Sequence, residues 1–240
     1  MDVKEEAILG EDIATHWYYV SKGRALRKIL GAIRVAEVLD VGAGSGVFSR
    51  QLIDAGVCQR AVCVDPAYRE ERTEKYHGHQ MRFVHAVKQH THKLVIMMDV
   101  LEHVDDDVAL LRDYTAGLPS DANVLITVPA FQFLWSGHDV FLEHRRRYTR
   151  TSIERVVKAA NLEVIRCRYF YGLLFPIIAA VRLRDKMLYR HNKLEAKSAL
   201  RQYPPLLNAA LTRIHDFERV TLFPLNTIAG ATIFCLARPK

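Results

Sequence analysis

The sequence predicts an α/β protein built on a doubly wound sheet of about seven strands, mostly parallel with an antiparallel last strand. Two observations support this prediction. Short apolar runs rich in Val, Ile and Leu alternate with amphipathic patterns from Glu37 onward, which implies right-handed crossovers between parallel strands. The runs are apolar on both faces, as expected for parallel strands that are covered by helices on either side.

Each element follows from its own pattern of apolar residues. The strands are expected over residues 37–41, 60–65, 81–86, 93–99, 123–129, 162–172 and 227–239. The main helices between them are expected over residues 47–56, 106–118 and 151–160. The acidic and polar segment 1–14 is expected to form a surface helix and is not a signal peptide by its composition.

The chain is interpreted as a single domain over residues 1–240. Its expected parts are an N-terminal helical cap over 1–35, a core over 36–172 and 226–240, and a helical insertion over 173–225 before the last strand. No uninterrupted apolar run reaches the ~20 residues that cross a bilayer, so no transmembrane helix is predicted.

The composition limits the partners without identifying one. The 240 residues carry a formal net charge of +7, and the pI is near 9.3. This charge permits contact with anionic lipid, nucleic acid or an anionic substrate, although scattered Lys and Arg more often form a solvated surface. The four cysteines form no CxxC pair and no metal-binding spacing with histidine. The sequence therefore predicts no metal site and a reducing, cytoplasmic location.

A glycine-rich segment, VLDVGAGSGVF over residues 38–48, lies where the first strand passes into a helix. Glycines at such a turn let a ligand approach the backbone. A dinucleotide loop has the pattern GxGxxG, whereas Val47 occupies the third glycine position here. Asp40 suits a cofactor with an ammonium group better than a pyrophosphate, and Asp65 can accept hydrogen bonds from the ribose of an adenosine. The loop therefore favours S-adenosylmethionine over NAD.

Three segments taken together, VLDVGAGSG, VCVDP and LVIMMDVLEHVDDD, resemble the class I S-adenosylmethionine-dependent methyltransferases, whose fold is Rossmann-like. Within this family the chain is similar to the methyltransferases of ubiquinone and menaquinone biosynthesis. The resemblance covers about residues 14–170. It implies an enzyme whose cofactor is S-adenosylmethionine.

The resemblance also implies which residues bind this cofactor. Those expected around its methionine part are Asp40, Gly42, Ala43, Gly44 and Gly46 in the glycine-rich loop, with Asp99, Val100 and Leu101 after the fourth strand. Asp65 is expected to hold the ribose, and Pro66 to shape the adenine pocket. The carboxylate that the family often has after the third strand is absent here, so the adenine is expected to contact the backbone near Val87, or Gln89.

An aromatic and basic segment precedes the first strand, and similar methyltransferases close such a segment over the cofactor. Lys22, or Arg24, is expected to pair with the cofactor carboxylate, and Tyr18 to offer a ring face to the sulfonium. Such a cation–π contact contributes about 0.5–2 kcal/mol. The alternative is an amphipathic helix that packs these aromatic rings on the core.

The segment after the fifth strand is expected to form the acceptor site, because substrates of open α/β sheets bind outside the carboxyl ends of the strands. The candidates are His138, Asp139, His144 and Tyr148 for catalysis, with Trp135 and Arg147 for acceptor binding. His138 or His144 is expected to act as a base oriented by Asp139, since histidine has a pKa of about 6.5. Arg147 and Tyr148 could hold an anionic or carbonyl group. The alternative is that these side chains form salt bridges that stiffen the loop.

The insertion over 173–225 combines an apolar run with a basic helical pattern. It could be a lid over the active site, a peripheral membrane contact or a homodimer interface. The expected function is therefore methyl transfer to a small acceptor that is hydrophobic or lipid-like, with oxygen as the expected accepting atom. If the insertion is a peripheral membrane contact, the cytoplasmic enzyme is expected to be membrane-associated.

The alternatives are a nucleic-acid or protein methyltransferase, a nicotinamide-dependent oxidoreductase and a non-catalytic cofactor-binding regulator. Methylation of amino groups on bases usually needs an Asn- or Asp-Pro-Pro-aromatic motif after the fourth strand, where this chain has Asp99 followed by VLE. No nucleic-acid partner is therefore expected. Val47 disfavours the oxidoreductase.

Overall fold

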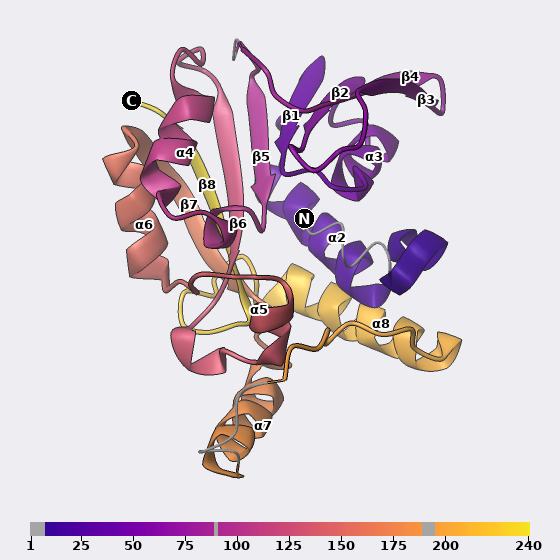
Figure 1. Cartoon of the computed structure of the whole chain (residues 1–240), viewed down its shortest axis with the longest axis vertical. Helices are drawn as coiled ribbons and strands as arrows, with labels where there is room; N and C mark the ends of the chain where they lie inside the picture. The colour runs from indigo at the N-terminus through magenta and orange to yellow at the C-terminus, as the bar shows by residue number, and fades with distance from the viewer. Residues whose placement is uncertain (1–7, 89–90, 189–194) are drawn as a thin grey trace.

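Eight strands form one sheet in the computed structural model, which describes residues 8–88, 91–188 and 195–240 (Figure 1). The strand order is β3-β4-β2-β1-β5-β6-β8-β7. The strands are β1 (Glu37–Val41), β2 (Arg60–Val64), β3 (Arg72–Tyr76), β4 (His79–Val84), β5 (Leu94–Met98), β6 (Asn123–Pro129), β7 (Leu162–Phe170) and β8 (Thr232–Pro239).

Helices cover both faces of this sheet. The α-helices are α2 (Trp17–Leu30), α3 (Val47–Asp54), α4 (Asp107–Thr115), α5 (Gly137–Phe141), α6 (Arg150–Ala159), α7 (Phe175–Leu188) and α8 (Pro205–Thr221). Short 3-10 helices are η1 (Gly10–Ala14), η2 (Leu101–His103) and η3 (Gln132–Leu134). Buried side chains of α2 and α3 pack on one face of the sheet and those of α4 and α6 on the other. The arrangement is the Rossmann-like one.

The direction of the strands confirms the predicted sheet. β4, β2, β1, β5 and β6 run parallel to one another, whereas β8 runs antiparallel to both β6 and β7. Along β1, Val38 belongs to one buried cluster and Leu39 to the other, because successive strand side chains point to opposite faces. Burial on both faces explains why the sequence shows continuous apolar runs.

The eighth strand is one that the sequence does not reveal. β3 forms an antiparallel hairpin with β4, and its sequence RTEKY is charged and largely exposed. The turn at His77 and Gly78 has φ angles of 49° and 84°, as in the two-residue turns that close hairpins. Charged side chains on an edge strand oppose pairing with another chain. Because these charged residues give β3 no apolar pattern, the strand cannot be predicted from the sequence.

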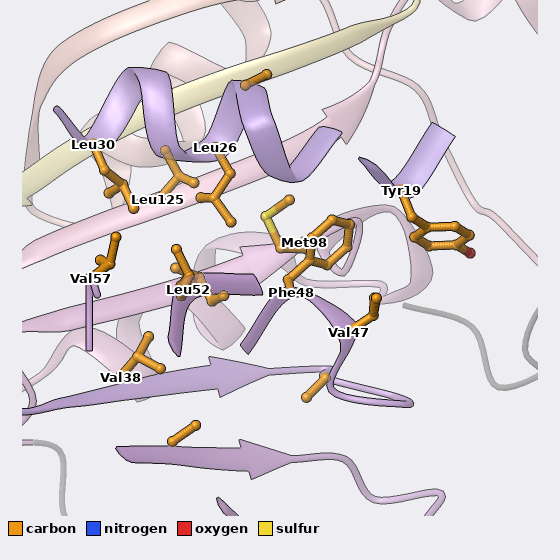
Figure 2. Close-up of a cluster of buried hydrophobic side chains, with 14 of the residues drawn as sticks. Tyr19, Leu26, Leu30, Val38, Val47, Phe48, Leu52, Val57, Met98 and Leu125 are labelled. Atoms are coloured by element: carbon orange, nitrogen blue, oxygen red, sulfur yellow. The ribbon is translucent and has the colours of Figure 1, made fainter. Parts of the chain in front are cut away.

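One buried cluster fills the space between the sheet and helices α2 and α3 (Figure 2). Leu26 of α2, Leu52 of α3 and Val38 of β1 are each fully buried there. Full burial of a leucine side chain stabilises the fold by about 1.5–3 kcal/mol. The cluster therefore holds α2 and α3 firmly beside β1. Because the glycine-rich loop joins β1 to α3, both ends of the loop are fixed as well.

Helices α7 and α8 lie at the edge of the sheet where the parallel strands end. α7 follows the end of β7 and projects away from the sheet, while α8 packs against α2 (Figure 1). In the part of the chain that the structure describes, no helix has the length and apolar character needed to cross a membrane. Of the helix expected over 1–14, residues 1–7 lie outside the described residues, and Gly10–Ala14 forms η1.

Candidate functional site

The glycine-rich loop between β1 and α3 turns sharply over residues 42–46. Gly42, Gly44 and Gly46 have φ angles of 67°, 50° and 74°, a left-handed conformation that favours glycine. A Cβ atom on Gly42 would lie 2.6 Å from Cγ2 of Val100. Only glycine therefore combines this backbone conformation with so close an approach to the segment after β5.

Most backbone donors of this loop are already engaged within the protein. The N–H groups of Gly42 and Ala43 donate to the Val64 carbonyl at 2.7 and 3.1 Å. The N–H of Gly44 donates to Oδ2 of Asp65 at 3.1 Å. A bound pyrophosphate needs free N–H groups at such a loop. The loop over residues 42–46 thus offers few free N–H groups to a pyrophosphate.

Two carboxylates flank the loop. Asp40 is buried beneath it, and the Ser49 hydroxyl of α3 donates to its Oδ2 at 2.7 Å. Its Oδ1 has no hydrogen-bond partner among the described residues. Burial, and to a smaller extent the charge of Asp65, raises the pKa of Asp40 to about 6. Asp65 lies just after β2, where its Oδ1 also accepts from the N–H of Ala67 at 2.9 Å.

The other residues predicted around the cofactor follow strand ends at the same edge of the sheet. Pro66 is exposed, Leu101 is buried, and Val87 and Val100 pack against the buried cluster on the α4 side. Gln89 lies outside the described residues. The strand ends thus gather these positions around the loop, as the parallel topology requires.

Helix α2 brings Tyr18 and Lys22 to the end of β5. The fully buried ammonium of Lys22 forms an ion pair with Oδ2 of Asp99 and donates to the Tyr18 hydroxyl at 3.0 Å. Asp99 has a φ angle of 57°, and its Oδ1 accepts from the Thr127 hydroxyl at 2.9 Å. Burial alone would raise the pKa of Asp99, but the Lys22 ammonium outweighs it and lowers that pKa below its usual value. Lys22 and Asp99 therefore compensate each other's charge.

A cavity of about 500 Å³ lies beside this group, at the carboxyl ends of β5 and β6. Its polar walls include Asp99 and, from the segment after β6, His138, His144 and Arg147. Apolar side chains of α7 and α8 form other walls. Its size and its few convergent polar groups are typical of a small-molecule site.

Asp139, His144 and Arg147 form one connected group at this cavity. Nδ1 of His144 lies 2.9 Å from Oδ1 of Asp139, and Arg147 donates to both carboxylate oxygens of Asp139 at 2.6 and 3.0 Å. Burial would raise the pKa of Asp139, but the hydrogen bonds from His144 and Arg147 hold it well below its usual range. A charged Asp139 favours the tautomer in which Nδ1 of His144 carries the hydrogen, and Nε2 is then able to accept a proton.

The other predicted acceptor residues are placed differently. Nδ1 of His138 accepts a hydrogen bond from the N–H of Ala199 at 3.1 Å, and burial lowers the pKa of His138 to about 4. The buried hydroxyl of Tyr148 donates to Oδ2 of Asp107 at 2.7 Å. Neither Tyr148 nor Trp135 is among the described residues that form the cavity walls. The structure thus brings His138 to the cavity and leaves Tyr148 and Trp135 outside it.

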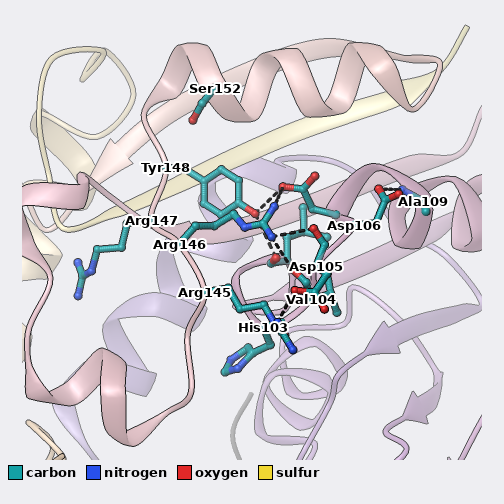
Figure 3. Close-up of polar contacts among 12 residues, drawn as sticks. His103, Val104, Asp105, Asp106, Ala109, Arg145, Arg146, Arg147, Tyr148 and Ser152 are labelled. Carbon is teal, nitrogen blue, oxygen red and sulfur yellow. Dashed lines mark hydrogen bonds and ion pairs between the residues drawn. The ribbon is translucent and has the colours of Figure 1, made fainter.

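The three consecutive arginines of the acceptor segment diverge (Figure 3). Arg145 forms an ion pair with Asp105, and Arg146 donates to the Val104 carbonyl at 2.8 Å. These two side chains tie the acceptor segment to the turn after β5. Arg147 points the other way and reaches the cavity.

Glu102 and Arg182 also line the cavity, although no pattern in the sequence points to a role for either residue. Glu102 is fully buried, and neither of its carboxylate oxygens has a partner among the described residues. Burial, reinforced by the charge of Asp99, raises the pKa of Glu102 well above its usual value. Glu102, His103 and His144 offer ligand atoms within 4.8 Å of one another, a donor set that could hold a divalent cation. The absence of a metal site therefore stays a prediction.

Comparisons with known proteins place this geometry among relatives. A family model described as a methyltransferase domain matches residues 15–166. No curated protein sequence matches the chain. Three solved structures illustrate the likeness of fold. A candidate methyltransferase in complex with the Haloferax volcanii Trm112 methyltransferase activator has a TM-score of 0.56 at 17% identity, over 95% of this chain and 92% of that chain.

The second is an S-adenosylmethionine-dependent methyltransferase from Clostridium acetobutylicum, with a TM-score of 0.50 at 10% identity, over 93% of this chain and 92% of that chain. The third is a phosphoethanolamine N-methyltransferase of Haemonchus contortus in complex with phosphomonomethylethanolamine and S-adenosylhomocysteine. Its TM-score is 0.51 at 15% identity, over 90% of this chain and 52% of that chain. At these identities the likeness shows the fold.

Proposed function

Because the chain belongs to the methyltransferase domain family and is a class I S-adenosylmethionine-dependent methyltransferase, we propose that it methylates an oxygen atom of a small acceptor that is hydrophobic or lipid-like. The observation that carries this proposal is the pair of His144 and Asp139 at a cavity with apolar walls from α7 and α8. A hydroxyl acceptor must lose its proton as the new bond to carbon forms, so a positioned base helps the reaction.

The residues around the glycine-rich loop fit the cofactor. S-adenosylmethionine supplies a methyl group that is activated by a sulfonium. Oδ1 of Asp40 is a buried oxygen without a partner among the described residues, which suits a cationic group nearby. In this proposal Asp65 accepts hydrogen bonds from the ribose, and Gly42 lets the methionine part approach the backbone.

His144 is proposed to remove the acceptor proton at Nε2. As its imidazole becomes positively charged, the Asp139 carboxylate stabilises that charge through the hydrogen bond at Nδ1. Arg147 holds the Asp139 carboxylate in place through its two hydrogen bonds and is therefore a positioning residue. Apolar side chains such as Ile178 and Leu211 exclude water from the cavity, and alignment of acceptor and methyl supplies much of the remaining rate.

Calorimetric titration tests the cofactor assignment. The protein is expected to bind S-adenosylmethionine and not NAD. Asp65→Asn is expected to weaken that binding by at least about tenfold, because it replaces charge-assisted hydrogen bonds that contribute about 1.5–3 kcal/mol each. Asp113→Asn, an exposed carboxyl of α4, is the matched control and is expected to bind normally. Tight binding of NAD, or unchanged affinity in Asp65→Asn, would contradict the assignment.

We also propose that the insertion contacts a membrane surface through one face of α8. Leu206 and Phe217 are 87% and 62% exposed, and Arg213 between them is also exposed. At about 100° per residue these three side chains lie within 40° of one another around the helix. An exposed helix face that combines apolar and basic side chains suits anionic lipid. A homodimer through the same face is the alternative.

A further inference from the structure

Arg147, the arginine expected to hold an anionic group, has few donors left for it. Its Nε and Nη2 donate to Asp139, and its Nη1 donates to the Ala130 carbonyl at 3.1 Å. The positive charge is compensated by the buried Asp139 carboxylate. An anionic group of the acceptor would have to compete with that carboxylate, so Arg147 is poorly placed to recognise one.

Arg182 of α7 is a second arginine at the same cavity, and its situation is different. Its side chain is half-buried, and no hydrogen bond or ion pair joins it to another described residue. Asp185, the acidic residue nearest along α7, is paired with Arg184 at 3.1 Å. Burial and the neighbouring Arg147 guanidinium lower the pKa of Arg182, although a guanidinium remains charged at neutral pH. A positive charge is thus held against the cavity without a dedicated partner.

The acidic side chains of the cavity do not supply that partner. Asp99 is committed to the buried ammonium of Lys22. Neither carboxylate oxygen of Glu102 has a hydrogen-bond partner among the described residues, so Glu102 is not paired with Arg182. Among the described residues, Arg182 therefore lies at the cavity without a hydrogen-bonded or ion-paired acidic partner, although the charges of Asp139 and Asp185 also act on it.

We propose that Arg182 binds an anionic phosphate or carboxylate group of the methyl acceptor. Arginine matches both groups geometrically, because its planar fork donates two parallel hydrogen bonds to their oxygens. The inference rests on the proposed function and narrows its substrate class. The acceptor is an amphiphile that carries one acidic group and an apolar chain.

The apolar chain has a path out of the cavity between α7 and α8. Ile178 of α7 and Leu211 of α8 form part of the wall. Ile177 and Leu207 also line the cavity and are 63% and 45% exposed, so they form an apolar rim where the cavity meets the surface. A chain too long for the cavity can leave over this rim.

Calorimetry with three probes tests the inference on the full chain in the presence of S-adenosylhomocysteine. The probes are decyl phosphate, the neutral decyl glucoside and inorganic phosphate, each used below any micelle concentration. Decyl phosphate is expected to bind at least about tenfold more tightly than decyl glucoside, the equivalent of one charge-assisted contact. Arg182→Gln is expected to abolish this preference while leaving the binding of decyl glucoside unchanged.

Two further variants separate recognition from folding. Arg184→Gln changes an exposed arginine of the same helix that is already paired with Asp185, and it is expected to keep the full preference for decyl phosphate. Arg182→Lys keeps the charge without the fork and is expected to retain part of the preference. If Arg182→Gln keeps the preference, or if the wild-type protein binds neither decyl compound, the inference is wrong.

The remaining outcomes distinguish a free anion from a lipid-like acceptor. They also distinguish failure of this inference from failure of the proposed function. If inorganic phosphate binds as tightly as decyl phosphate and Arg182→Gln weakens both, the site recognises a free acidic group; much weaker binding of inorganic phosphate supports a lipid-like acceptor. Normal binding of S-adenosylhomocysteine without any preference between the decyl compounds overturns only this inference. Loss of S-adenosylhomocysteine binding in the wild-type protein would instead contradict the proposed function.

Discussion

His144 depends for its proposed role on two neighbours. Nδ1 of His144 is hydrogen-bonded to the Asp139 carboxylate, and Arg147 keeps that carboxylate charged by two further hydrogen bonds. His138 on the same segment has its Nδ1 occupied by the N–H of Ala199 and a pKa lowered to about 4 by burial. A base is most effective when its pKa lies near the working pH. The contacts therefore favour His144 as the base.

Replacing His144 tests this assignment at the level of one side chain. His144→Gln is expected to lower kcat by about 10²–10⁴-fold, the usual contribution of general base catalysis, with unchanged affinity for S-adenosylmethionine. His138→Gln is expected to lower kcat only a few-fold. Turnover is measured as release of S-adenosylhomocysteine in the presence of a small-molecule extract of the source cells. Equal losses in the two variants would contradict the assignment.

The role of a residue could be predicted from the sequence where local backbone constraints determine it. The role could not be predicted where it depends on a partner that is distant along the chain. Gly42 and Gly46 need left-handed backbone at a turn between a strand and a helix, and this demand is visible in the motif itself. The hydroxyl of Tyr148 bonds Asp107, which lies 41 residues away along the chain, and no pattern around Tyr148 indicates that contact. The same holds for Arg182, because only the tertiary structure brings its helix α7 to the cavity.

At the scale of elements, the bond between Asp40 and Ser49 joins β1 to α3 beneath the glycine-rich loop. Asp40 is buried, and its pKa is raised from the usual 3.8 to about 6. A carboxyl with a raised pKa stabilises the folded state most when it is protonated, below pH 4, and that stabilisation is lost as the pH rises through about 6. The junction that forms the cofactor site is therefore destabilised at neutral pH.

The pH dependence of unfolding measures this effect. The free energy of unfolding contributed by Asp40 is expected to fall by up to about 3 kcal/mol between pH 4 and pH 7, since each pKa unit corresponds to about 1.4 kcal/mol. Asp40→Asn is expected to flatten this decline in denaturant titrations without cofactor. Asp113→Asn, on the exposed face of α4, is expected to keep the wild-type slope. An identical slope in Asp40→Asn would show that its carboxyl is not the cause.

Elements that are buried on both faces could be predicted well, because burial imposes the apolar pattern. β5 is an example, with every residue buried. β3 could not be predicted, because its five residues lie at the sheet edge and none of them is buried. The arrangement of α7 and α8 around the cavity was equally beyond prediction, since several packings satisfy one amphipathic pattern.

At the scale of the whole molecule, the exposed apolar face of α8 and the apolar rim of the cavity occur on the same insertion. Leu206 lies beside Leu207, which lines the cavity and is itself 45% exposed. A surface that binds lipid through α8 would therefore bring the cavity opening close to that lipid. An amphiphilic acceptor could then enter without crossing water.

Vesicle sedimentation tests this arrangement. The protein is expected to bind vesicles of phosphatidylglycerol more tightly than vesicles of phosphatidylcholine. Leu206→Ser together with Phe217→Ser is expected to weaken binding by at least about tenfold, because each apolar side chain contributes about 1.5–3 kcal/mol when buried. Ile165→Ser, which removes a 44% exposed side chain from β7, is the control and is expected to bind normally.

An unchanged sedimentation of the double variant would contradict the membrane contact. A change from dimer to monomer in light scattering, with vesicle binding unaltered, would identify the same face as a homodimer interface instead. Both measurements use the full chain, so the two outcomes can be compared directly.

The position of β8 between β6 and β7 has a consequence for biosynthesis. β7 has β8 as its one strand neighbour in the described sheet, yet β8 leaves the ribosome some sixty residues after β7 has been made. Domains commonly begin to fold while they are being translated, but β7 cannot pair within the sheet until β8 has been synthesised. Leu174 just beyond β7 and Thr232 at the start of β8 both border the cavity. The acceptor site is thus completed only when translation has passed β8, and a nascent chain that has exposed only the glycine-rich half contains no acceptor site.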